Sequence, residues 1–186
     1  MSSVVFLRAV NVGKANRCRP GEIAKKLSRF DVVNIGAVGT FVVRKEVSES
    51  TLRAAIAREL PFKIEIMICP AREILNLVAS DPFKGQPSGP MITRFVNVLH
   101  KPLTSHVTRL PRRSTAKEGH MSLSLPSEEA WLAKVIAIRG RFVLGVYRRE
   151  MKAIGCLGKL EKQIGVPATN RNWNTIEKIV AVLKAG

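Results

Sequence analysis

The stretch VVFLRAVNV, residues 4–12, predicts the strand around which the first half of this chain forms. Its residues are β-branched and apolar and show no helical period, which is typical of a strand in the centre of a sheet. A short loop, residues 13–17, follows this strand. The next helix is expected to begin at Pro20, because proline suits the first turn of a helix.

The segments after this helix alternate between strand and helix patterns. Ser48 is a suitable N-cap, and Pro61 ends the helix that Ser48 begins. The expected elements are a helix from 20 to about 30, strands over 32–35 and 40–44, a helix over 48–60, a strand over 63–69 and a helix from 70 to about 81. The order β-α-β-β-α-β is that of a ferredoxin-like plait.

A glycine- and proline-rich stretch, residues 85–90, marks a boundary, because its residues continue neither a helix nor a strand. We therefore expect a first half over residues 1–86 and a second half over residues 87–186. The second half is expected to contain strands over 91–100 and 121–125, a hairpin over 132–147 and helices over 151–164 and 175–184.

A short internal repeat links the two halves. The pattern Arg-x-Val-Asn-Val occurs at residues 8–12 and again at residues 94–98, at the start of each half. We infer a duplication and predict an α+β fold with two tandem ferredoxin-like halves (α/β plaits), antiparallel sheets and an extra C-terminal helix.

The composition is strongly basic. The chain has 31 Lys and Arg against 14 Asp and Glu, a net charge of +17 at pH 7. Such an excess favours polyanionic partners, with nucleic acid first and an acidic membrane surface second. The alternative is a basic surface that has no specific ligand.

Cysteine usage and hydropathy indicate the compartment. Cys18, Cys69 and Cys156 are far apart and form no CxxC pair, which is typical of reduced thiols. Arg8 interrupts the apolar N-terminal run, so no signal peptide is expected, and no stretch has the ~20 apolar residues of a membrane helix. We expect a cytoplasmic protein with no membrane contact, either a monomer or a homodimer.

The stretch TNRNWNT, residues 169–175, allows two interpretations. In the structural one, Asn174 or Asn172 caps the last helix and Trp173 packs against a sheet. In the functional one, Arg171 and Trp173 lie on the surface, where they hold a phosphate and stack a base.

The chain resembles the bacterial family known as domain of unknown function 1697. Members usually show leucine-arginine-glycine-x-asparagine-valine-glycine near the N-terminus and threonine-x-arginine-asparagine-tryptophan-asparagine-threonine near the end. Residues 7–13 and 169–175 match these stretches, and residues 79–83 resemble the family's alanine-x-x-proline-phenylalanine region. The resemblance implies two ferredoxin-like halves and no established activity.

Three positions depart from the family pattern. Ala9 replaces a glycine, residues 37–40 (AVGT) replace glutamine-serine-glycine-asparagine, and residues 147–150 (YRRE) replace a proline-containing turn. If these groups form a shared site, this chain has a reduced or altered one.

No motif for catalysis, metal binding or a cofactor is present in the sequence. There is no GxSxG, Walker loop or GxGxxG. His100, His106 and His120 are spread over a loop-rich segment, which favours exposed or hydrogen-bonded histidines over a metal site. We therefore lean toward a protein that is not an enzyme and expect neither metal nor cofactor.

Two basic surfaces are candidates for anion binding. One is the loop after the first strand, where helix amides and cations can face a phosphate. The other combines the segment 101–119 with the hairpin turn. The candidate residues are Arg8, Asn11, Lys14, Arg17, Arg19, Arg112, Arg113, Arg141, Arg171 and Trp173.

The leading hypothesis is a protein that binds nucleic acid or another polyanion through phosphate contacts. One alternative is an enzyme or binding protein for a small anionic metabolite in a groove between the halves, anchored by Arg8, Lys14 and Arg171. Another is a structural module that binds a protein partner.

Overall fold

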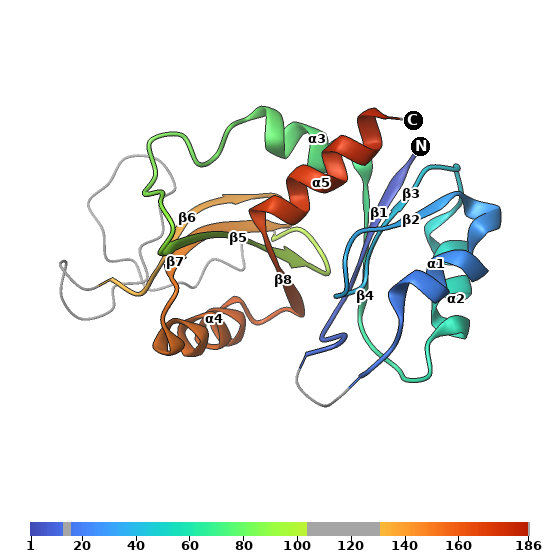
Figure 1. Ribbon diagram of the computed structural model, residues 1–186, viewed down its shortest axis with the longest axis horizontal. Coiled ribbons are helices and arrows are strands. Elements are labelled where there is room, and N and C mark those ends of the chain that lie inside the picture. The colour runs from blue at the N-terminus through green and yellow to red at the C-terminus, as the bar shows by residue number, and fades with distance from the viewer. Residues whose placement is uncertain (13–15, 104–130, 186) are drawn as a thin grey trace. The chain divides into compact units, whose positions relative to one another are not determined.

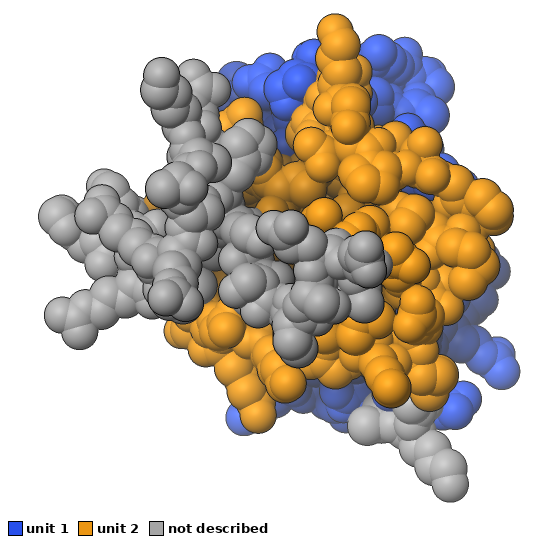
Figure 2. Space-filling view, turned by 90° about the vertical axis from the view of Figure 1, so that its left-hand side faces the viewer, with its two compact units in different colours: residues 1–80, 174–186 blue, residues 81–173 orange. Residues whose placement is uncertain are grey.

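The computed structural model describes residues 1–12, 16–103 and 131–185. The chain separates into two compact units, which Figure 2 colours separately: unit 1 comprises Met1–Ser80 and Asn174–Gly186, and unit 2 comprises Asp81–Trp173. This division differs from the expected boundary at residue 86, and the last helix groups with unit 1. A hydrogen bond explains part of this grouping, because Arg44 Nη2 donates to the carbonyl of Val182 at 3.2 Å.

Unit 1 contains a four-stranded antiparallel sheet in the order β2-β3-β1-β4 (Figure 1). The strands are β1 Ser3–Leu7, β2 Val32–Asn34, β3 Thr40–Val43 and β4 Ile66–Pro70. The helices are α1 Pro20–Lys26, the 3-10 turn η1 Ser28–Phe30, α2 Glu49–Glu59, α3 Ala71–Ala79 and α5 Trp173–Lys184. In Figure 1, α1 and α2 cover one face of the sheet, and α3 and α5 cover the other.

The expected strand over residues 4–12 is too long. Strand β1 ends at Leu7, and the chain then turns through Ala9 and Asn11, whose φ angles are 54° and 55°. A residue in this left-handed region cannot continue a strand. Val10, which follows the end of the strand, is nevertheless buried in the core of unit 1, and this accounts for the apolar residue at that position.

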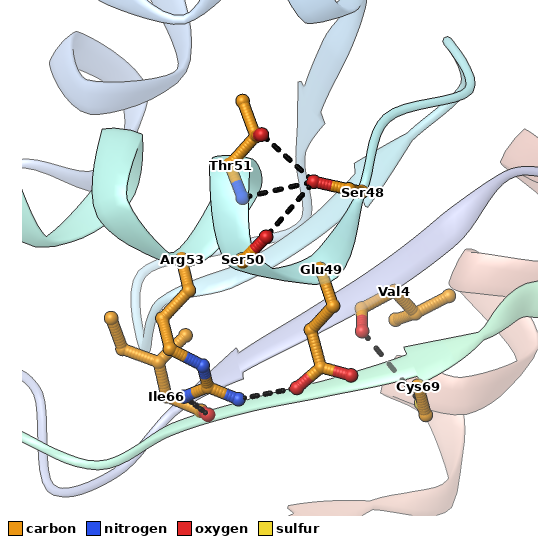
Figure 3. A network of polar contacts seen from close by, with 8 residues as sticks. All are labelled: Val4, Ser48, Glu49, Ser50, Thr51, Arg53, Ile66 and Cys69. Atoms are coloured by element: carbon orange, nitrogen blue, oxygen red, sulfur yellow. Dashed lines mark hydrogen bonds and ion pairs between the residues drawn. The ribbon is translucent and has the colours of Figure 1, made fainter.

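The other predicted elements of unit 1 are confirmed within a few residues of their expected bounds. Ser48 caps α2, since its Oγ accepts from the Thr51 amide at 3.2 Å (Figure 3). Arg53 then links this helix to β4 by donating to the carbonyl of Ile66 at 2.6 Å, and it also donates to Glu49 of the same helix at 2.7 Å. These contacts hold α2 against the face of the sheet that carries Ile66 and the main core of the unit.

Unit 2 contains a second antiparallel sheet, in the order β6-β7-β5-β8. Its elements are β5 Ile92–Leu99, β6 Ala133–Arg139, β7 Phe142–Arg148, α4 Met151–Ile164 and β8 Ala168–Asn172. The hairpin and α4 are confirmed, whereas β8 was not predicted, because its polar sequence ATNRN has no apolar alternation. The expected strand over 121–125 and most of the segment 101–119 lie outside the described residues.

The two sheets correspond strand by strand. In each, the first strand is central and pairs antiparallel with the third and fourth strands of its unit. The α+β class with two four-stranded antiparallel sheets is thus confirmed. The repeated Arg-x-Val-Asn-Val pattern does not occupy equivalent places, because residues 94–98 lie within β5 and residues 8–12 follow β1. In the part of the chain that the structure describes, no helix combines the length and apolar character needed to cross a bilayer.

Packing in unit 2 leaves no room for a side chain at Gly145 of β7. A Cβ there would overlap the backbone oxygen of Lys134 and the ring of Phe95. We expect Gly145→Ala to lower the free energy of unfolding by about 1–3 kcal/mol or more, because overpacking displaces neighbours that cannot move. Urea unfolding measures the change.

The matched control is Gly155→Ala on the exposed side of α4, where a Cβ meets nothing within 4 Å. Alanine favours the helix over glycine, so this variant should gain about 0.5–1 kcal/mol. Equal effects of the two substitutions would contradict the proposed packing.

Candidate functional site

Asn11 organises the loop that follows β1. Its Nδ2 donates to the carbonyls of Cys18 at 2.9 Å and Ala37 at 2.7 Å, and its Oδ1 accepts from the Cys18 amide at 3.0 Å. Both amide hydrogens and one oxygen lone pair are thus used within the protein. Asn11, which we predicted as an anion ligand, therefore has an architectural role in holding the loop.

The loop also meets the turn between β2 and β3. The Leu7 amide donates to the Gly39 carbonyl at 2.8 Å, and a Cβ at Gly39, whose φ is 71°, would overlap the Leu7 side chain. The two stretches that carry departures from the family pattern, residues 7–13 and 37–40, therefore lie together. Their contact uses Asn11 and backbone groups, so the loss of polar side chains over residues 37–40 leaves it intact.

The cations predicted for this loop differ in exposure. Arg8 is half-buried and its amide donates to the Glu65 carbonyl at 3.0 Å, while Arg17 and Arg19 are exposed. Lys14 lies outside the described residues, as do Gly13 and Ala15. Burial raises the pKa of the nearby Cys18 thiol, which favours its neutral form.

Arg171 and Trp173 lie in the interior. Arg171 is 5% exposed and Trp173 is 7% exposed. The Nη1 of Arg171 donates to Thr169 Oγ1 at 2.8 Å and to the Asn170 carbonyl at 2.7 Å. The Trp173 ring meets the Phe83 ring edge-on, with centroids 4.8 Å apart. This placement corresponds to the structural interpretation of the closing stretch.

Burial also changes the chemistry of Arg171. Desolvation lowers the pKa of its guanidinium to about 10. Because α5 begins at Trp173, Asn172 occupies the position before the helix, and Asn174 lies within its first turn. Of the two caps considered from the sequence, only Asn172 has the position that a cap requires.

The hairpin turn of unit 2 gathers cations, of which one, Arg141, is half-buried. The Leu99 amide donates to the Arg141 carbonyl at 2.9 Å, and the Leu103 amide donates to the Gly140 carbonyl at 3.3 Å. These bonds place Lys101 beside the turn that carries Arg139 and Arg141. We call these three cations the turn cluster. Arg112 and Arg113 lie outside the described residues.

A second group in unit 2 was missed by the sequence interpretation. Trp131 is half-buried, and its ring has Lys134 Nζ at 4.8 Å and Arg148 Cζ at 5.2 Å from its centroid. We call these three residues the Trp131 cluster. The sequence contains a signal for this cluster, because an aromatic residue beside the first strand of a basic hairpin can form a cation–π contact with its cations.

The remaining chemistry of the described residues is sparse. They contain no cluster of three or more His, Cys, Asp or Glu side chains placed to hold a metal ion. His106 and His120 lie outside the described part of the chain. Exposed Glu46 has a lowered pKa, because the N-terminal ammonium donates a hydrogen bond to it and adds its charge.

Asn11 offers a direct test of the loop architecture. Asn11→Ala removes three hydrogen bonds and places alanine at φ 55°, so we expect a loss of about 2–4 kcal/mol in the free energy of unfolding. Asn11→Gly removes the same bonds without the strain and should lose about 1 kcal/mol less. Asn174→Ala, at an exposed helical position, should change stability by less than about 0.5 kcal/mol. Urea unfolding of all three decides; similar losses for Asn11→Ala and Asn174→Ala would rule out the architectural role.

The lowered pKa of Arg171 predicts that the stability of the protein depends on pH. Its pKa in the folded state is lowered, so the unfolded chain binds the proton more tightly and stability from this group rises as pH increases above about 10. In Arg171→Lys the rise should begin at lower pH, because the ordinary pKa of lysine is about 10.4 and burial lowers it further.

The measurement is urea unfolding of Arg171→Lys between about pH 8 and about pH 10. Relative to the unsubstituted protein, its stability should climb by up to about 1.4 kcal/mol per pH unit. Arg72→Lys, at an exposed position, is the control and should show no such slope. A flat difference for Arg171→Lys would mean that position 171 is solvated.

Comparison with known proteins gives one match. No curated protein and no solved structure matches the chain. The family described as "Protein of unknown function (DUF1697)" matches residues 1–123, so the match includes the Asn11 loop and ends before the closing stretch. On this match, which covers more than half of its length, the chain belongs to the DUF1697 family.

Proposed function

We propose that this protein binds polyanions, most simply nucleic acid, through contacts to phosphate groups. The observation that supports the proposal is the surplus of cations in unit 2. Between Trp131 and Trp173 the only acidic residues are Glu150 and Glu161. The basic residues in the same span are Lys134, Arg139, Arg141, Arg148, Arg149, Lys152, Lys159, Lys162 and Arg171.

In unit 1, by contrast, ion pairs within the unit neutralise part of the positive charge. Several of its cations pair with carboxylates: Lys25 with Glu22 at 3.1 Å, Lys26 with Glu59 at 3.2 Å and Arg53 with Glu49 at 2.7 Å. In unit 2, Arg139, Lys152 and Lys159 are exposed, and no carboxylate of the described residues lies within ion-pair distance of them. Cations that lack internal partners remain available to phosphates.

We further propose that both units are ferredoxin-like plaits and that the protein is cytoplasmic. The strand orders β2-β3-β1-β4 and β6-β7-β5-β8 support the first statement, since a β-α-β-β-α-β chain with its first and third strands central has this order. The reduced thiols of Cys18, Cys69 and Cys156 support the second.

The proposal is tested by titrating the protein with duplex DNA, single-stranded DNA, RNA and inorganic polyphosphate at about 50 mM and about 200 mM salt. Binding through Z phosphate contacts should weaken with a log–log slope near −0.9Z for duplex and near −0.7Z for single strands. If none of the four polyanions binds at low salt, the proposal is wrong.

The turn cluster can be tested in the same titration. Arg139→Gln with Arg141→Gln should reduce the duplex slope by about 1.8, because two phosphate contacts are lost. Arg58→Gln with Arg72→Gln removes the same charge from exposed positions of unit 1 and is the control. If both double variants reduce the duplex slope equally, the net charge of the protein and not the turn cluster determines binding.

A further inference from the structure

The Trp131 cluster has the composition of a contact site for a nucleotide. Its three side chains combine one half-buried indole with a primary ammonium and a guanidinium, both within about 5 Å of the ring centre. A base needs a ring to stack on, and a phosphate needs a cation. The cluster offers both groups at one place.

The register of the sheet fixes the position of these cations. Lys134 of β6 lies opposite Val146 of β7, which lies opposite Arg94 of β5. Arg148 is two residues from Val146 and therefore points to the same face of the sheet. Arg94 also lies against an aromatic ring, with its Cζ 5.3 Å from the centroid of Phe83. Three adjacent strands thus present cations on one face, opposite the face that packs on α4 through Val135 and Val143.

The cations of the cluster form no ion pair with a described carboxylate. No carboxylate among the described residues lies within ion-pair distance of Lys134 or Arg148. The Nε of Arg148 is buried and has no hydrogen-bond acceptor among the described residues, so the contact with a phosphate falls to the outer nitrogens of its guanidinium. By contrast, the neighbouring Arg149 is used, since its Nε donates to Thr93 Oγ1 at 3.1 Å.

Energies indicate that a base can compete for the ring. A cation–π contact contributes about 0.5–1 kcal/mol at an exposed site and about 2 kcal/mol when desolvated, whereas stacking of a base on an aromatic side chain contributes about 1–3 kcal/mol. The two ranges are comparable, so a base that displaces one cation from Trp131 replaces the lost contact, and the displaced cation then gains a contact to the adjoining phosphate.

We propose that Trp131, Lys134 and Arg148 form a binding site for single-stranded nucleic acid, in which Trp131 stacks a base and the two cations contact the backbone. This inference rests on the proposed polyanion binding and adds the strand type, the residues and the stacking contact. It also predicts a preference for single strands over polyphosphate, because polyphosphate has no base to stack.

The experiment uses the full chain and a single-stranded thymidine oligonucleotide, with inorganic polyphosphate as the ligand without bases. Trp131→Ala should weaken oligonucleotide binding about 5- to 150-fold, since it removes one stacking contact, and should leave polyphosphate binding unchanged. Trp131→Phe keeps a ring and should recover part of this loss. In the unsubstituted protein, oligonucleotide binding should quench the fluorescence of Trp131, while Trp173, only 7% exposed, gives a constant background.

A matched pair of double variants separates the site from general charge. Lys134→Gln with Arg148→Gln should lower the salt slope for the oligonucleotide by about 1.4. Lys63→Gln with Arg72→Gln removes one lysine and one arginine from exposed positions of unit 1 and should change it less. This comparison does not depend on the stability of the Trp131→Ala variant.

The outcomes distinguish the two proposals. If the oligonucleotide binds but Trp131→Ala binds equally well, or if both double variants lose equally, the site is wrong and polyanion binding stands. If neither the oligonucleotide, duplex DNA, RNA nor polyphosphate binds at low salt, both proposals are wrong. Selective loss in Trp131→Ala and in Lys134→Gln with Arg148→Gln supports the site.

Discussion

Antiparallel pairing of a central first strand is the interaction on which both units depend. Strand β1 is hydrogen-bonded to β3 on one edge and to β4 on the other, and β5 is bonded in the same way to β7 and β8. Residues Val4 to Leu7 are fully buried, so apolar side chains on both faces of β1 anchor the layers on either side. Every other element of the sheets takes its position from these two strands.

The end of β1 shows how closely architecture and candidate chemistry are linked. Because β4 and β3 both pair with β1 up to its last residues, the chain must turn away at once, and it does so with left-handed residues at Ala9 and Asn11. Asn11 suits this position, since asparagine tolerates positive φ and its side chain bonds nearby backbone groups. The residue that looked like a ligand in the sequence is thus the one that closes the turn.

The closing stretch follows the same logic in unit 2. Residues 169–172 of this stretch belong to β8, the edge strand beside β5, with Arg171 opposite Val96 and Thr169 opposite Val98. Both valines are fully buried, and so the side chains paired with them are drawn into the interior. Arg171 is therefore a buried cation held by Thr169 and a backbone carbonyl, while the cations of α4 are exposed.

The sequence by itself determined the elements whose signals are local. Apolar periodicity predicted α1, α2, α3 and α4. Residue type predicted the Ser48 cap and the glycine turn of the β6–β7 hairpin. Each of these signals depends on residues within a few positions of one another. It also determined the α+β class and the cationic excess, which are properties of order and composition.

Only the tertiary structure decided the features that depend on residues far apart in the chain. Strand β8 forms from a polar segment because β5 offers it a free edge, and the last helix packs with unit 1 through a contact between Arg44 and Val182. The Trp131 cluster and the burial of Arg171 likewise arise from pairing across strands. Local pattern carries no information on such partners, because a strand's neighbours and a side chain's exposure are set by the sheet as a whole.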